Sequence, residues 1–272
     1  MNKDYIILEE NGIKYISFPT FEKTKLAKCV FSTRQGGASP PPYNTLNLGL
    51  STDDNIDDVI ENRKRFSKII NKPITKPLFQ IHGIDIVKFD NFDYTDDFTK
   101  DIRVEKFPYA DGVITNLKGL GINVSLADCI AIFILDPINK AAGIAHSGWR
   151  GTVKNIAGVL LEKMKKEYNT KPENCLSAVS PGIAKCCFLV NEEVYEEFNN
   201  TYPEYSDLYT EKWNKYSIDL HNINKRLLLN EGIKESNISM ADLCTSCNKD
   251  IFFSHRRDKG ITGRMMGIIA LT

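Results

Sequence analysis

Two short apolar runs joined by a turn constrain this sequence more than any other feature. Residues 130–135 and 141–145 are hydrophobic or small, and the five residues between them, DPINK, include the proline and asparagine typical of turns. This pattern predicts a β-hairpin. Because Cys129 precedes the first run and His146 follows the second, we expect both side chains at the same open end of the hairpin.

A thiol beside an imidazole has two common chemical uses. The imidazole can act as a base for a nucleophilic thiolate, or both groups can bind a metal ion. A purely structural role is the third alternative, because an isolated cysteine or histidine near apolar strands is more often part of the core than part of a site. The hairpin therefore indicates a candidate site at Cys129 and His146 without choosing its chemistry.

The segment after the hairpin predicts a place for an anion. Residues 147–151, SGWRG, lead directly into an amphipathic helix expected over 153–168. The first turn of a helix presents free backbone N–H groups and a positive dipole end, and both attract anions. The helix entrance after Gly151, with Arg150 beside it, could therefore seat an anionic group; capping by Thr152 is the alternative.

Four other arginines, one of them in a loop, are also candidates for binding an anionic group. Arg256, Arg257 and Arg264 could bind an anionic substrate, although arginines of this kind are usually solvated or paired with acids such as Asp258. Arg34 stands where an expected strand meets a loop rich in glycine and proline. The sequence contains no Walker loop, dinucleotide fingerprint or Gly-x-Ser-x-Gly elbow, so the site has to be assembled from distant segments.

The composition limits the classes of protein to which the chain can belong. It has 272 residues, 42% of them hydrophobic, which is enough for a sizeable core. Lys plus Arg and Asp plus Glu both number 35, so the net charge gives no indication of a nucleic acid or an anionic membrane as a partner. We find neither a secretory signal nor a bilayer-length apolar stretch and expect a cytoplasmic protein.

The seven cysteines predict free thiols. Their number is odd, and a chain of this size does not need disulfides to be stable. Cys244 and Cys247 have the spacing of a zinc knuckle, but a closed zinc site needs a second pair, and the adjacent Cys186 and Cys187 lack ligand spacing. We therefore expect two ordinary thiols at 244 and 247.

Hydrophobic periodicity predicts strands and helices in alternation along the chain. Strands are expected over 5–8, 14–18, 28–33, 77–87, 109–115, 121–126, 176–180, 238–241, 251–258 and 267–271, and helices over 55–70, 153–168, 192–198 and 220–228. His82 falls within or beside one of these strands, and on its own it would be assigned a structural role.

Seven short motifs, spread in order over nearly the whole chain, resemble those of the laccase-domain, or polyphenol-oxidase-like, family. They are FSTRQGG at 31–37, NLG at 47–49, QIHG at 80–83, ADG at 110–112, ADC at 127–129, AHSGWRG at 145–151 and FSHRRD at 253–258. The sequence departs from the family pattern at Ser147, where alanine is frequent, at Ala131, where proline is frequent, and at His255, where an aromatic residue is usual.

The resemblance implies an α/β (α+β) fold: a single domain over residues 1–272, with layered β-sheets flanked by helices, similar to the catalytic domain of cytotoxic necrotizing factor. It also implies a metal triad of His82, Cys129 and His146. The activity implied is that of a purine nucleoside phosphorylase acting on adenosine, inosine, guanosine and methylthioadenosine, with adenosine deamination as a second activity; one bacterial branch of the family is linked to peptidoglycan editing.

The implied triad and the residue counts together predict the cofactor and the partners. Two imidazoles and one thiolate suit Zn²⁺ and leave one coordination position open for catalysis. Copper is an alternative ion, but four histidines are too few for a multicopper oxidase. The expected partners are a nucleoside and phosphate, the latter held by Arg34, Arg150 and the backbone at Gly151. Two alternatives stay open: a metal-free cysteine hydrolase or amidase, with a peptidoglycan precursor as a candidate substrate, and a non-enzymatic metal-binding module.

Overall fold

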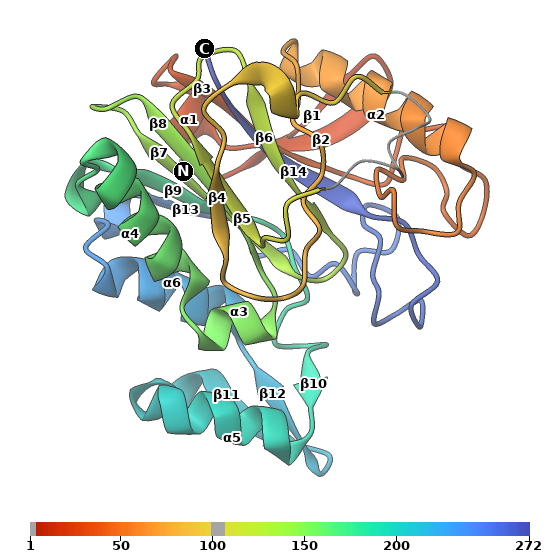
Figure 1. Cartoon of the computed structure of the whole chain (residues 1–272). Coiled ribbons are helices and arrows are strands. Elements are labelled where there is room, and N and C mark those ends of the chain that lie inside the picture. Colours follow the sequence, from red (N-terminus) through yellow and green to blue (C-terminus); the bar gives the residue numbers. More distant parts are fainter. Residues whose placement is uncertain (1–3, 99–106) are drawn as a thin grey trace.

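Two β-sheets packed face to face form the centre of the protein. The computed structural model describes residues 4–98 and 107–272. Helix α2 covers the outer face of one sheet, and helices α4 and α6 cover the outer face of the other (Figure 1). The α/β class predicted from the sequence is confirmed. The single domain over 1–272 and the likeness to cytotoxic necrotizing factor stay predictions.

The first sheet has five strands, all antiparallel to their neighbours, in the order β1-β2-β3-β14-β6. The strands are β1 (Ile6–Glu10), β2 (Ile13–Ser17), β3 (Ala27–Ser32), β6 (Gly121–Leu126) and β14 (Met265–Leu271). Successive residues of β14 point to opposite faces, so that Ile269 packs between the two sheets and Ile268 packs under α2.

The second sheet has six strands in the order β13-β9-β7-β8-β5-β4. They are β4 (Ile86–Lys88), β5 (Gly112–Thr115), β7 (Ile130–Asp136), β8 (Ala141–Ser147), β9 (Leu176–Val179) and β13 (Ile238–Met240). The outermost pairs, β13 with β9 and β4 with β5, are parallel, and the inner pairs are antiparallel.

The predicted hairpin is confirmed as the pair β7–β8 at the centre of this sheet. Every residue of both strands is buried. Ile130, Ile132 and Ile134 pack toward the helices, whereas Ala131, Phe133 and Leu135 pack toward the five-stranded sheet. Burial on both faces explains why the two runs are apolar throughout instead of alternating with polar residues.

The helices surround the sheets. They are α1 (Pro19–Glu22), α2 (Ile56–Ile70), α3 (Trp149–Val153), α4 (Ile156–Tyr168), α5 (Glu192–Thr201) and α6 (Leu220–Asn230), with short 3₁₀ segments at Phe92–Tyr94, Pro172–Asn174, Pro203–Leu208 and Glu235–Asn237. Helix α5 lies beside a small sheet of β10 (Leu189–Val190), β12 (Lys215–Ile218) and β11 (Tyr209–Lys212), at the lower end of the molecule in Figure 1. No helix in residues 4–98 and 107–272 is long and apolar enough to cross a membrane.

The helix expected over 153–168 is divided into two, which corrects the sequence-based prediction. Asn155 adopts a left-handed conformation with φ 53° and ends the α3 segment. Its side chain then accepts a hydrogen bond from the N–H of Gly158 and caps α4. The helix entrance next to His146 therefore belongs to the five-residue α3, which begins at Trp149 rather than after Gly151.

Two expected strands are largely absent. The strand expected over 77–87 is reduced to β4, because the preceding residues form a loop in which His82 has φ 59°. The strand expected over 251–258 is a series of turns, closed by hydrogen bonds from the N–H of Asp258 to the carbonyl of Ser254 and from the N–H of Gly260 to the carbonyl of His255.

Candidate active site and metal centre

The open end of the β7–β8 hairpin places Cys129 and His146 together, as the sequence predicts. Ala131 pairs with His146 in the strand register, and Ile130 pairs with Ser147. Cys129 immediately precedes the paired residues of β7. The imidazole of His146 is buried and the thiol of Cys129 is partly buried, so both lie on a rigid support.

His82 reaches the same place from the loop before β4. The carboxylate of Asp111, at the start of β5, accepts hydrogen bonds from three successive backbone N–H groups of this loop: Ile81 (3.2 Å), His82 (3.0 Å) and Gly83 (2.6 Å). These bonds hold His82 in its left-handed conformation, which is uncommon for a residue other than glycine. The histidine is thereby directed at Cys129 from across the hairpin end.

The three side chains form a compact cluster. One ligand atom from each of His82, Cys129 and His146 lies within 4.8 Å of the other two, and the imidazole rings are 4.9 Å apart at an angle of 83°. Gly148 allows this approach, since a Cβ at that position would lie 3.1 Å from Cδ2 of His82 and 3.2 Å from Sγ of Cys129. The triad implied by the resemblance is therefore brought together in space.

Asp111 also orients His146. Its Oδ1 lies 2.8 Å from Nδ1 of His146, and because a carboxylate can only accept, Nδ1 carries the proton and donates the hydrogen bond. Nε2 is then the nitrogen left for a metal ion or for the thiol. A carboxylate behind a histidine is the usual outer partner of a metal-binding imidazole, where it fixes both the tautomer and the ring orientation.

The electrostatics of the cluster favour an ionised thiol. Burial by itself would raise the pKa of Cys129, but the charge of His146 and hydrogen bonds from His146 and His82 outweigh it and lower the pKa to about 6. Burial would likewise lower the pKa of His146, yet Cys129 and Asp111 raise it to about 9. A thiolate with two nitrogen donors is a ligand set that fits zinc.

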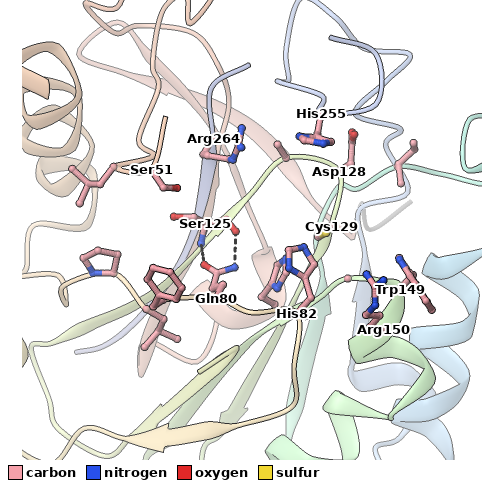
Figure 2. Close-up of a pocket in the computed structure, with 18 of the residues that line it drawn as sticks. Ser51, Gln80, His82, Ser125, Asp128, Cys129, Trp149, Arg150, His255 and Arg264 are labelled. Atoms are coloured by element: carbon pink, nitrogen blue, oxygen red, sulfur yellow. Dashed lines mark hydrogen bonds between the residues drawn. The ribbon is translucent and has the colours of Figure 1, made fainter. Parts of the chain in front are cut away.

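The cluster opens into a cavity of about 1200 Å³ (Figure 2). Its wall combines aromatic and apolar side chains with a few polar groups, including Gln80, Asp128 and His255. The rings of Phe79 and Tyr109 form a pair 4.6 Å apart on this wall and are 52% and 65% exposed. A mostly apolar pocket with convergent polar groups is typical of a small-molecule site.

The predicted anion-binding residues fall into two groups. Arg150 lines the cavity and stacks on Trp149 at 4.2 Å, whereas Gly151 is buried in α3 and Arg34 does not line the cavity. The guanidinium of Arg34 donates to the carbonyls of Asn44 (2.8 Å) and Lys249 (3.0 Å). Arg34 therefore joins two loops.

Two of the other arginines line the cavity. Arg264 donates through Nη1 to the carbonyls of Thr262 and Gly263, and Arg256 donates to the carbonyl of Leu189. In Figure 2, Arg264 lies above His82 and Arg150 lies to its right. Arg257 instead binds Asp258 and backbone carbonyls, so its role is structural.

Asp111, Gly148 and Asp128 are site residues that pattern reasoning missed. Asp128 has φ 86° and accepts hydrogen bonds from the hydroxyl of Thr245 (2.6 Å) and the N–H of Arg256 (2.7 Å), which fixes the residue before Cys129. Asp111 and Asp128 each occur in a short Ala-Asp motif at a strand end. An acidic residue next to a buried strand was the signal that could have found them.

A sequence model of the family described as multi-copper polyphenol oxidoreductase laccase matches residues 28–272. The chain belongs to this family. The resemblance seen in the seven motifs is thereby confirmed, and the matched region contains all three residues of the His82, Cys129 and His146 cluster.

Relatives within the family have names that refer to nucleosides. The chain is 34% identical over 248 residues to the purine nucleoside phosphorylase YlmD of Geobacillus stearothermophilus, covering 88% of each protein. It is 35% identical over 255 residues to the purine nucleoside phosphorylase YfiH of Escherichia coli, covering 93% of this chain and 97% of that one. Both names state a phosphorylase activity on purine nucleosides for those relatives.

A solved structure from the family has the same fold. The hypothetical protein YfiH of Bacillus licheniformis superimposes with a TM-score of 0.89 at 31% identity, over 100% of both chains. The fold described above is therefore shared with this solved relative.

Adding a methyl group at Gly148 is expected to weaken metal binding at the cluster. In Gly148→Ala the new Cβ would press on His82 and Cys129, whereas in the control Gly151→Ala its nearest neighbours lie at 3.5 Å, an ordinary contact. Isothermal titration of chelator-treated protein with zinc should show roughly 10-fold or weaker binding for Gly148→Ala, the size of effect seen when groups around metal ligands are disturbed. Equal affinities in the two variants would contradict this geometry.

Proposed function

We propose that this protein is a zinc-dependent purine nucleoside phosphorylase acting on adenosine, inosine, guanosine and methylthioadenosine, with adenosine deamination as a second activity. The observation that carries the proposal is the cluster of His82, Cys129 and His146 on the wall of a cavity that is also lined by aromatic rings and arginines. The names of the relatives support the same activity.

His82, Cys129 and His146 would hold the zinc ion, with Asp111 behind His146. Two imidazoles and a thiolate leave a position free for substrate, which distinguishes a catalytic site from a closed structural one. Zinc bound there would supply a Lewis acid that polarises a substrate oxygen. Copper is the alternative ion, but in residues 4–98 and 107–272 only two histidines join such a cluster, too few for multicopper chemistry.

The exposed rings of Phe79 and Tyr109 are suited to the purine base. Large apolar side chains that line a cavity and remain exposed gain free energy when a flat ligand covers them. A base stacked on this pair would direct its ribose toward the cluster. Because stacking recognises the ring face and not its substituents, this contact is compatible with adenine, guanine and hypoxanthine alike.

Arg264 and Arg150 are the side chains that would hold phosphate. Burial lowers the pKa of Arg264, while the charges of Cys129 and Asp128 raise it, and a guanidinium stays protonated at neutral pH. Within the described chain only its Nη1 makes side-chain hydrogen bonds, so Nε and Nη2 can donate to an anion. The direct role predicted for Arg34 stays a prediction; its contacts suit the positioning of the loops around the site.

Phosphorolysis forms a bond between a phosphate oxygen and C1′ of the ribose and breaks the glycosidic bond, whose electron pair leaves with the base. The chain would contribute by holding phosphate and nucleoside in contact and by keeping the phosphate charge paired with arginine. Deamination of adenosine would use water in place of phosphate and act on the base, so the two activities differ in their products.

A cysteine hydrolase or amidase is the second candidate, and one observation favours it. The lowered pKa of Cys129 and the raised pKa of His146 describe a thiolate–imidazolium pair, which is also the resting state of a nucleophilic cysteine. A peptidoglycan precursor would be a substrate class for such an enzyme. A non-enzymatic metal-binding module is the third candidate, and it would leave the exposed rings of Phe79 and Tyr109 without a function.

The first experiment follows adenosine turnover by zinc-loaded protein with and without phosphate. We expect adenine and ribose 1-phosphate to appear only when phosphate is present, with inosine as the product of the second activity. Adenine released equally well without phosphate would indicate a hydrolase. No turnover of any of the four nucleosides with zinc bound would contradict the proposed function.

Replacing Arg264 tests the proposed phosphate site. Loss of a charged hydrogen-bond donor costs about 1.5–3 kcal/mol, so Arg264→Gln should raise the KM for phosphate roughly 10- to 100-fold. The KM for nucleoside should change much less. Arg226→Gln removes an arginine that binds Asp207 away from the cavity and serves as the control. An unchanged KM for phosphate in Arg264→Gln would show that this arginine does not bind phosphate.

A further inference from the structure

Four cysteines from two distant segments meet at a second place in the molecule. Cys186 and Cys187 lie in the turn before β10, and Cys244 and Cys247 follow β13. One sulfur from each lies within 4.8 Å of the other three. The fold thus brings Cys186 and Cys187, which lack ligand spacing in the sequence, to Cys244 and Cys247.

Cys186 and Cys187 are adjacent in the sequence, and a tight turn of the backbone at this point allows both sulfurs to reach one partner. The N–H groups of Cys187 and Phe188 both donate to the carbonyl of Ala184, at 2.9 Å each. The chain is therefore coiled at this point, and two adjacent residues can present their sulfurs to the same partner. Sγ of Cys247 lies 3.6 Å from that of Cys186 and 3.4 Å from that of Cys187.

These distances fit a metal site better than a disulfide. A disulfide joins sulfurs at about 2.05 Å. Four sulfurs around a tetrahedral zinc ion at about 2.3 Å are about 3.8 Å apart. The two distances from Cys247 lie close to the second value, and all seven cysteines are free thiols in the structure.

A backbone donor and an arginine lie beside this group of sulfurs. The N–H of Ala184 donates to Sγ of Cys244 at 3.5 Å. The side chain of Arg256 also reaches this corner and donates to the carbonyl of Leu189. Amide donors and a nearby cation both offset the negative charge of a thiolate cluster.

We propose that Cys186, Cys187, Cys244 and Cys247 bind a second zinc ion in a closed, four-thiolate site. Four protein sulfurs fill a tetrahedral coordination shell, so this ion has no position for substrate and its role is structural. Each thiol gives up its proton to the solvent on binding, and zinc with four thiolates carries two negative charges.

The second zinc ion would stabilise the part of the cavity wall that lies beside Cys129. Thr245, between two of the cysteines, donates to Asp128, and Asp128 also accepts from the N–H of Arg256. Phe188, directly after Cys187, and His255 both line the cavity. The four-cysteine site therefore joins the turn before β10 to the loop that fixes the residue preceding Cys129.

Metal content per chain, measured by plasma mass spectrometry on protein purified in reductant without chelator, tests the proposal. Wild-type protein should carry two zinc ions. Cys247→Ser and His82→Ala should each carry one, and the double variant none. Ser246→Ala, within the same loop, and Cys175→Ala, a buried thiol outside the cluster, should retain two. Two ions in Cys247→Ser would overturn the proposal.

Two measurements keep the test independent of variant folding. Titration of wild-type protein with an organomercurial should release two zinc ions. With cobalt(II) in place of zinc, His82→Ala protein should show the intense sulfur-to-metal charge-transfer bands of a four-thiolate site.

Two results would overturn the proposal. The first is a single zinc ion in wild-type protein that is absent from His82→Ala protein. The second is a disulfide between Cys247 and Cys186 or Cys187 in freshly purified, zinc-free protein, which would identify a redox pair instead of a metal site. These outcomes do not depend on phosphorolysis.

Discussion

The carboxylate of Asp111 makes the interactions on which the geometry of the site depends. It accepts hydrogen bonds from Nδ1 of His146 and from the backbone N–H groups of Ile81, His82 and Gly83. Burial would raise its pKa, but these hydrogen bonds lower it, so the group remains ionised. One side chain thus sets the tautomer of one histidine and the backbone conformation of the other, and the cluster is formed before any ligand arrives.

The two packed sheets give that carboxylate a fixed position. β5, which Asp111 precedes, pairs with β8, which ends in His146 and Ser147, and β8 pairs with β7 directly after Cys129. Every residue of these three strands is buried, so displacement of any one would disturb a close-packed core. The same strand ends also position Arg150, soon after β8, and Tyr109, shortly before β5, on the wall of the cavity.

The parts of the fold that depend on local pattern were predictable, and those that depend on long-range polar contacts were not. The β7–β8 hairpin and helix α2 follow from apolar periodicity and turn residues, and so does the meeting of Cys129 with His146. The loop of His82 depends on a carboxylate about 30 residues further along, so only the resemblance to a family indicated it. The break at Asn155 and the gathering of four cysteines likewise arise from a single backbone conformation and from contacts about 60 residues apart.

The catalytic role of zinc at Cys129 is tested most directly by a zinc titration of chelator-treated protein with two readouts in parallel: adenine released from adenosine in phosphate, and iodoacetamide labelling mapped to Cys129. Zinc bound by His82, Cys129 and His146 should protect the thiol as it restores phosphorolysis. We therefore expect labelling to fall and activity to rise together over the same range of zinc. Full phosphorolysis by metal-free protein whose Cys129 labels freely would contradict it.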